Sequence, residues 1–193
     1  MRVALTAFTR NGIALAQRLS AALEGEGHTC TSAFPQRLAE DGGLDSYSDL
    51  SGWTGEQFRR AEALLFVGAC GIAVRAVAPF VRDKFTDPAV VSVDERGRFV
   101  IPLLSGHVGG ANELALRIAG LTGGQAALST ATDVNGLFAV DVWARERGMA
   151  VTERAAAKAV SAALLEGKPV GFCSDFGHPC PPGLWEETDT ALG

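Results

Sequence analysis

The segment at residues 105–110 (Ser-Gly-His-Val-Gly-Gly) carries the residue types best suited to chemistry in this sequence. His107 lies in a polar loop rather than on an apolar stripe, and an imidazole titrates near neutrality, so His107 is a candidate general base. Glu113 lies in the first turn of the helix predicted next. A carboxylate there stays ionised near the positive end of the helix dipole and could orient His107.

The same segment offers backbone donors. Because two glycines immediately precede a predicted helix, we expect the N–H groups of Gly109, Gly110 and Ala111 to face an anion or a developing oxyanion. The spacing matches neither GxGxxG nor GxxxxGK[ST], which argues against a nucleotide pyrophosphate. Two alternatives stay open at this point: an ordinary strand-to-helix turn, and a His107 that only bonds a backbone carbonyl.

A basic cluster of Arg75, Arg82 and Lys84 stands out in an acidic chain, in which 17 Lys and Arg face 22 Asp and Glu for a formal net charge of −5. Guanidinium and ammonium groups bind carboxylates through charge-assisted hydrogen bonds, so a polycarboxylate could bind here. A solvated helix face is the alternative. The net negative charge predicts no binding to nucleic acid or to an anionic membrane surface.

Two further groups of polar residues occur toward the C-terminus. Thr132 and Asp133 place a hydroxyl and a carboxylate after a predicted strand, although Asp133 could simply cap the next helix. Cys173, His178 and Cys180 form a loose C-x4-H-x-C pattern. A structural zinc site needs four ligands, so we expect no metal site in the protein, and the role of these three residues stays open.

The elements that must position these residues alternate between strands and helices. This pattern predicts an α/β fold, a mostly parallel sheet flanked by helices with one β-hairpin excursion at 89–93 and 98–102, and a small second α/β subdomain. We expect residues 1–150 to form the main domain and residues 151–193 to begin a central or linker region with a partly irregular tail.

Ligands of open α/β sheets bind beyond the carboxyl ends of the strands. Three glycine-bearing loops follow predicted strands, at residues 68–71, 105–110 and 130–136. We therefore expect these loops to share one end of the sheet.

Composition narrows the class of protein. A hydrophobic content of 47% can supply a sizeable core, which argues against a disordered chain. No segment reaches the roughly 18 consecutive apolar residues of a membrane helix. The four cysteines form no CxxC pair and are widely scattered, so reduced thiols and a cytoplasmic location are expected.

A series of motifs in a fixed order resembles the CbiG family of cobalamin biosynthesis. The motifs are FVGACGIAVR at 66–75, APFVRDK at 78–84, DPAVV at 87–91, DE at 94–95, LSGHVGGANELA at 104–115, TATD at 130–133 and FAVD at 138–141. The resemblance is clear over residues 53–148 and looser on both sides, where ALLEGK at 163–168 is similar to the central region of the family.

The resemblance implies a cobalt-precorrin-5A hydrolase of the anaerobic route to vitamin B12. The implied reaction opens the ring-A δ-lactone of a cobalt-bound tetrapyrrole with water and releases acetaldehyde, giving cobalt-precorrin-5B. Cobalt arrives with the substrate, so no cofactor is expected. His107 and Glu113 are the expected catalytic residues. The residues expected to contact the substrate, including cations for its acetate and propionate arms, are Gly71, Arg75, Lys84, Ser105, Gly106, Gly109, Gly110, Asn112, Thr132 and Asp133.

Members of the family usually continue into a further C-terminal domain. The alternative function is therefore a non-catalytic corrinoid-binding module that needs a separate C-terminal domain for activity. The expected partners are the cobalt tetrapyrrole and either a second copy of the chain or a separately encoded C-terminal domain. The sequence leaves the general base and the oligomeric state open.

Overall fold

The computed structural model describes residues 1–39 and 43–186. The chain forms two compact units, Met1–Leu128 and Ser129–Gly193, which are described separately below. This division falls earlier than the boundary expected at residue 150. The helices that follow residue 128 pack against one another in the second unit, a grouping that helical periodicity alone does not reveal.

The first unit is built on a six-stranded sheet with the order β2-β1-β5-β6-β7-β8. Its strands are β1 (Arg2–Ala7), β2 (Thr29–Ser32), β5 (Ala63–Val67), β6 (Ala89–Val93), β7 (Phe99–Leu104) and β8 (Gln125–Ala126). Strands β2, β1, β5 and β6 are mutually parallel, whereas β7 pairs antiparallel with β6. The mostly parallel α/β sheet and its hairpin excursion are confirmed.

The direction of β7 decides where its flanking loops lie. We call the end of the sheet where β1, β5 and β6 finish the carboxyl end, and the opposite end the amino end. Val67 pairs with Val93 at the carboxyl end, whereas Leu104, the last residue of β7, pairs with Val90 near the amino end. Residue 105 therefore leaves the sheet at the amino end.

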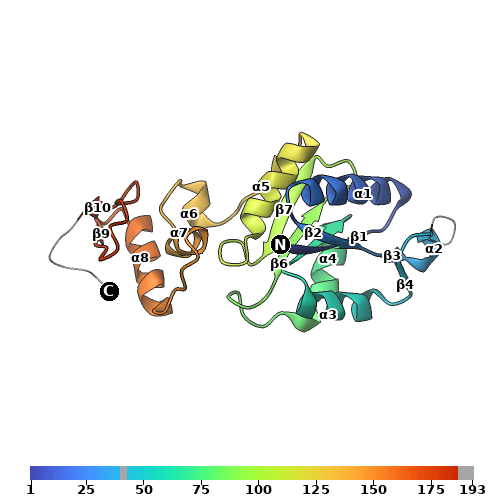
Figure 1. The fold of residues 1–193 in the computed structure, drawn as a ribbon, viewed down its shortest axis with the longest axis horizontal. Helices are drawn as coiled ribbons and strands as arrows, with labels where there is room; N and C mark the ends of the chain where they lie inside the picture. The colour runs from blue at the N-terminus through green and yellow to red at the C-terminus, as the bar shows by residue number, and fades with distance from the viewer. Residues whose placement is uncertain (40–42, 187–193) are drawn as a thin grey trace. The chain divides into compact units, whose positions relative to one another are not determined.

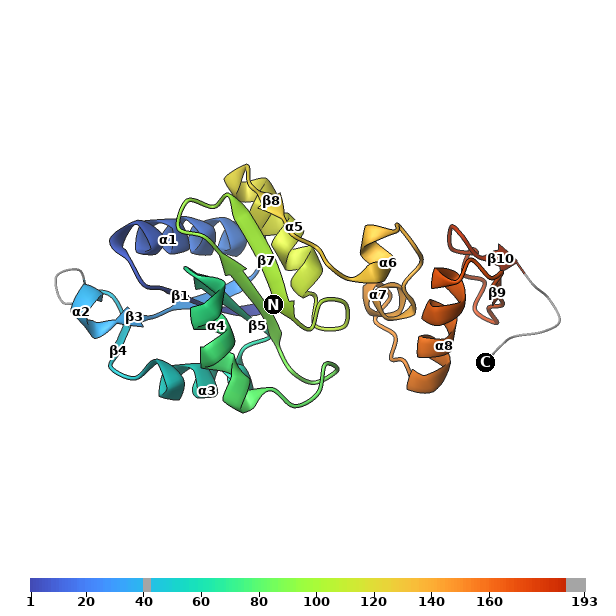
Figure 2. The ribbon, with the colours of Figure 1, turned by 180° about the vertical axis from the view of Figure 1, so that it is seen from behind.

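Helices cover both faces of the sheet (Figures 1 and 2). Helices α1 (Arg10–Gly25) and α5 (Ala111–Thr122) pack on one face, and α3 (Leu50–Arg60) and α4 (Cys70–Val77) on the other. Side chains of β5 alternate between the two layers, Leu65 with the first pair of helices and Leu64 and Phe66 with the second. All five residues of β5 are buried, as expected for a strand covered on both faces.

Shorter elements complete the first unit. The 3₁₀ turn η1 (Ala78–Phe80) follows α4. Between β2 and α3 lie β3 (Phe34–Pro35), α2 (Gln36–Ala39) and β4 (Ser46–Tyr47), and β3 pairs in parallel with β4.

The second unit contains three helices and a two-stranded parallel sheet among its described residues. They are α6 (Ala131–Val134), α7 (Val140–Glu146), α8 (Arg154–Leu165), β9 (Gly171–Phe172) and β10 (Trp185–Glu186). Trp143 is central to its packing, with ring centroids 5.6 Å from Phe172 and 5.5 Å from His178.

Candidate functional site

The loop at residues 105–110 lies at the amino end of the sheet, between β7 and α5. The Ser105 hydroxyl donates a hydrogen bond to the carbonyl oxygen of Asp87, 2.9 Å away, just before β6. The loop at residues 68–71 follows β5 at the carboxyl end. The expectation that these two loops share one end of the sheet is wrong, because β7 runs antiparallel to β5 and β6.

The loop backbone is held by its own hydrogen bonds. The Ala111 N–H donates to Ser105 O at 3.1 Å, and the Gly110 N–H donates to His107 O at 3.0 Å. The prediction that these two N–H groups face an anion is therefore wrong, because each already has an acceptor inside the loop. Within the described residues the Gly109 N–H has no acceptor, so of the three predicted donors it is the one that stays available to a ligand.

Close packing explains the glycines and the unusual backbone of the loop. A Cβ added to Gly109 would lie 2.4 Å from Ser105 Cβ, and one added to Gly106 would lie 2.8 Å from Asn112 Oδ1. Ser105 itself has φ 56°, the one non-glycine residue with positive φ in the described chain. Such a conformation is costly for serine and is held here by the bond to Asp87.

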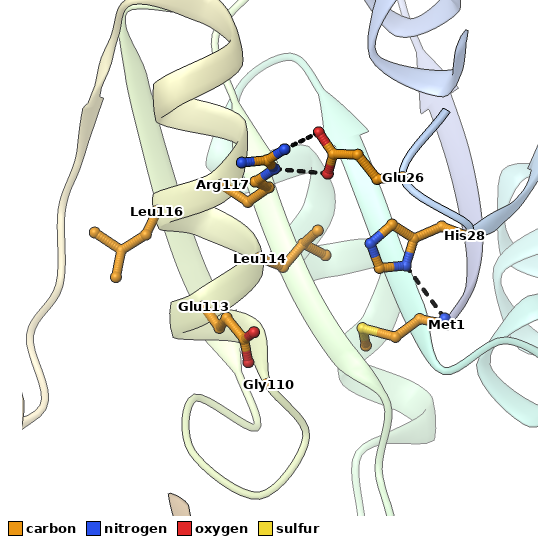
Figure 3. Close-up of a pocket in the computed structure, with 8 residues that line it drawn as sticks. All are labelled: Met1, Glu26, His28, Gly110, Glu113, Leu114, Leu116 and Arg117. Carbon is orange, nitrogen blue, oxygen red and sulfur yellow. Dashed lines mark hydrogen bonds and ion pairs between the residues drawn. The ribbon is translucent and has the colours of Figure 1, made fainter. Parts of the chain in front are cut away.

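The two candidate catalytic residues lie on either side of this turn. His107 is half-buried near the apex of the loop, and Glu113 is exposed in the first turn of α5. Glu113 and Gly110 line a pocket of about 490 Å³ at the amino end of the sheet. In Figure 3 the Glu113 carboxylate projects beside the Gly110 end of the helix.

The opposite wall of this pocket is polar. Arg117 donates two hydrogen bonds to the Glu26 carboxylate, and the bond from Nε measures 2.6 Å. This pairing lowers the pKa of the Glu26 carboxyl and raises the pKa of Arg117. The Met1 ammonium lies 3.2 Å from His28 Nδ1. Figure 3 shows the other His28 ring nitrogen turned toward the Leu114 side of the pocket.

The predicted basic cluster separates into two parts. Arg75 is exposed on α4, and its guanidinium donates to the Gly71 carbonyl at 3.4 Å, which carries it back toward the carboxyl end. Lys84 is exposed in the segment between η1 and β6 at the amino end, with its ammonium 5.0 Å from the centre of the Phe85 ring. Gly71 and Arg75 therefore lie together, away from the loop that contains His107.

The remaining predicted residues belong to the second unit. Thr132 is buried and Asp133 is exposed in α6, and their contact with substrate stays a prediction. His178 packs edge-on against the Trp143 ring. No group of three or more His, Cys, Asp or Glu side chains in the described residues is arranged to hold a metal ion.

Some residues that line these pockets were not predicted. They include Glu26, His28 and Arg117 in the larger pocket, and Arg59 in a smaller pocket described below. These residues lie far apart in the sequence and carry no local motif, so only the pairing of strands brings them to one end of the sheet.

Among residues 1–39 and 43–186, no helix has the length and apolar character needed to span a bilayer.

The first unit is an α/β domain with two pockets at the amino end of its sheet, an arrangement that can bind a ligand, and comparison with known proteins makes the class specific. The family model described as Cobalamin synthesis G N-terminal matches residues 52–133, and the one described as Cobalamin biosynthesis central region matches residues 138–187. The chain belongs to the cobalamin biosynthesis G family, of which it carries these two regions.

Individual relatives agree with this assignment. A cobalt-precorrin-5A hydrolase of Salmonella typhimurium is 42% identical over 90% of this chain and 48% of its own length. One of Priestia megaterium is 28% identical over 98% of this chain and 54% of its own length. The chain thus spans about half the length of these curated relatives.

A solved structure supports the fold. The crystal structure of a cobalamin biosynthesis protein G homolog from Sulfolobus solfataricus matches with a TM-score of 0.58 at 19% identity. The match covers 94% of this chain and 52% of that one. At this identity the likeness supports the α/β fold alone.

Proposed function

We propose that this chain acts in the hydrolysis of cobalt-precorrin-5A, with water opening the ring-A δ-lactone and acetaldehyde leaving to give cobalt-precorrin-5B. The observation that carries the proposal is the 42% identity to a curated cobalt-precorrin-5A hydrolase over 90% of this chain. The matched region includes the whole loop at residues 105–110, which lies inside the stretch covered by the N-terminal family model.

In the proposed mechanism, His107 accepts a proton from the attacking water as the water oxygen bonds to the lactone carbonyl carbon. The negative charge that develops on the carbonyl oxygen is stabilised by the Gly109 N–H, which alone of the three predicted donors has no acceptor among the described residues. When the ring C–O bond breaks, the alkoxide oxygen stays on the two-carbon unit that leaves. Its electron pair forms the carbonyl group of acetaldehyde as the C–C bond to the macrocycle breaks, and the macrocycle takes up the proton held by His107. Glu113 is proposed to orient His107 from the first turn of α5.

The cobalt belongs to the substrate in this proposal, so the chain itself supplies no metal or cofactor. Residues at the amino end of the first unit are proposed to contact the macrocycle. The predicted contact of Thr132 and Asp133 in α6 is a separate proposal for the second unit. We further propose that the protein works in the cytoplasm, where its four cysteines stay reduced.

The test is an anaerobic incubation of the chain with cobalt-precorrin-5A, with acetaldehyde release as the readout. We expect release by the wild type and a loss of about 10²-fold or more in His107→Ala, the range that a general base contributes. His178→Phe is the matched control, because a phenyl ring keeps the packing against Trp143 and removes the imidazole. Equal rates for His107→Ala and the wild type would exclude His107 as the base.

The length of the relatives favours a second candidate. Because the chain spans about half of them, it could be a corrinoid-binding module that needs the remaining region for chemistry. A folded chain that binds cobalt-precorrin-5A without releasing acetaldehyde would establish this alternative. Release that begins only when the other half of a relative is added would locate the missing catalytic groups there.

A further inference from the structure

We propose that a second pocket at the amino end of the sheet, between the end of α3 and the segment that leads into β6, binds a carboxylate on a short alkyl arm of the ligand. The pocket has a volume of about 210 Å³, and Arg59 and Arg82 both line it. The inference rests on the proposed function for the identity of the ligand, a cobalt tetrapyrrole with acetate and propionate arms. The carboxylate chemistry follows from the pocket itself.

Two guanidinium groups give the pocket its charge. Arg59 extends from the last turn of α3, and Arg82 follows η1. Within the part of the chain that the structure describes, neither side chain has an acidic partner. Two arginines against one aspartate, Asp87, give the pocket lining a net positive charge, in a chain whose net charge is −5. Such planar donors bind carboxylates and phosphates through paired, charge-assisted hydrogen bonds.

The acidic side chains near the pocket bind other groups than the Arg59 and Arg82 side chains. Asp87 lines the pocket, but its Oδ2 atom accepts hydrogen bonds from the Arg82 N–H at 2.7 Å and the Asp83 N–H at 3.0 Å. Glu56, one turn before Arg59, pairs instead with Arg60. Asp87 therefore fixes the backbone that carries Arg82, and the guanidinium charge remains for a ligand.

The walls of the pocket suit the methylene groups of an alkyl arm. Phe58 and Phe80 lie with ring centroids 6.1 Å apart and both line it. A Cβ added to Gly55 would lie 2.7 Å from Phe80 Cζ, so the glycine lets this ring lie directly against α3. An arm with a charged end and an apolar stem matches such a pocket better than an inorganic anion does.

The pocket is joined to the candidate catalytic loop through one residue. Asp87 lines the pocket, and its backbone carbonyl oxygen accepts a hydrogen bond from the Ser105 hydroxyl. A carboxylate held by Arg59 and Arg82 would thus lie next to the residues that carry the His107 loop. This position allows one arm of a large ligand to be held while the rest of it reaches His107.

The test compares the wild type with the double variant Arg59→Gln/Arg82→Gln. Arg96→Gln is the matched control, because Arg96 is an exposed arginine in the β6–β7 turn at the opposite end of the sheet. Binding of cobalt uroporphyrin, a tetrapyrrole with acetate and propionate arms, is titrated by absorbance. We expect the double variant to bind about 10-fold or more weakly, the effect of losing one charge-assisted hydrogen bond, and the control to bind like the wild type. With cobalt-precorrin-5A, KM should rise by a similar factor and kcat should change little.

Other results separate the inference from the proposed function. If the wild type and the double variant bind cobalt uroporphyrin equally, the inference is wrong, whatever the hydrolase activity. If the wild type neither binds it nor releases acetaldehyde from cobalt-precorrin-5A, the proposed function fails. The pocket is then probed by NMR with glutarate, a simple dicarboxylate. Arginine Nε–H shifts present in the wild type and lost in the double variant would support a carboxylate site, and no shifts in the wild type would overturn it.

Discussion

Replacing Gly109 by alanine should strain the candidate catalytic loop without abolishing the fold. The new Cβ would lie 2.4 Å from Ser105 Cβ, 2.8 Å from Ser105 O and 3.4 Å from Ala89 N. Carbon atoms in contact normally lie about 3.5–4.0 Å apart, so the loop must shift by about 1 Å or more. The two neighbours that lie too close are Ser105 O, a backbone atom, and Ser105 Cβ, which is fixed to the backbone, so neither can rotate away. We therefore expect the upper part of the usual overpacking range, about 3 kcal/mol of unfolding free energy.

The measurement is urea unfolding followed by the fluorescence of Trp53, which lies in the first unit, in a background with Trp143→Phe and Trp185→Phe. Gly120→Ala is the control in the same region, because its Cβ would meet nothing within 4 Å on α5. Alanine there should stabilise the unit by about 0.5–1 kcal/mol through its better helix propensity. A Gly109→Ala variant within about 0.5 kcal/mol of the wild type would refute the close packing of the loop.

Two further predictions concern the hydrogen bonds around β6 and β7. Burial alone would raise the pKa of Asp94, but N–H groups of Phe99 (2.6 Å) and Arg96 (2.9 Å) bond its carboxylate and hold the pKa below the usual value of 3.8. Asp94→Asn should therefore lower the free energy of unfolding by about 1–2 kcal/mol at pH 7, measured by urea unfolding. The difference in stability between the variant and the wild type should shrink as the pH falls below the usual pKa and through the lowered one. A difference that stays constant down to pH 2 would contradict this prediction. Ser105→Ala should cost about 1 kcal/mol by losing the bond to Asp87, and Ser105→Gly should cost less because glycine tolerates the positive φ; the reverse order would contradict the described backbone.

Apolar patterning predicted the central strands well. The run at residues 63–67 is continuous and apolar, and it forms a strand buried on both faces. The start of α3 is not evident from the sequence, because Ser51 and Gly52 are typical of loops. In the structure the Asp49 carboxylate accepts hydrogen bonds from both of their N–H groups, so the helix begins at Leu50. A side-chain cap of this kind starts a helix before its apolar periodicity begins.

The position of the loop at residues 105–110 was predicted incorrectly, although the predicted hairpin already implied the correct end of the sheet. Ligand loops gather at the carboxyl ends of parallel strands. The predicted hairpin at 89–93 and 98–102 reverses the direction of its second strand, so the loop after that strand lies at the other end of the sheet. Gly71 and His107 were grouped by their glycine-rich surroundings, and the reversal separates them. To predict which residues line the two pockets at the amino end, one needs the order of the strands in the sheet, and local sequence patterns do not encode that order.

This reversal places the loop at residues 105–110 between two pockets on opposite faces of the sheet. Gly110 lines the larger pocket beside Glu113 and Arg117, and Ser105 bonds to Asp87, which lines the smaller pocket. Under the proposed function, a macrocycle with several carboxylate arms would need more than one point of attachment, and the loop between the two pockets carries His107. A shift of this loop would disturb both pockets at once. Gly109→Ala should therefore weaken ligand binding as well as stability, whereas Gly120→Ala should change stability alone.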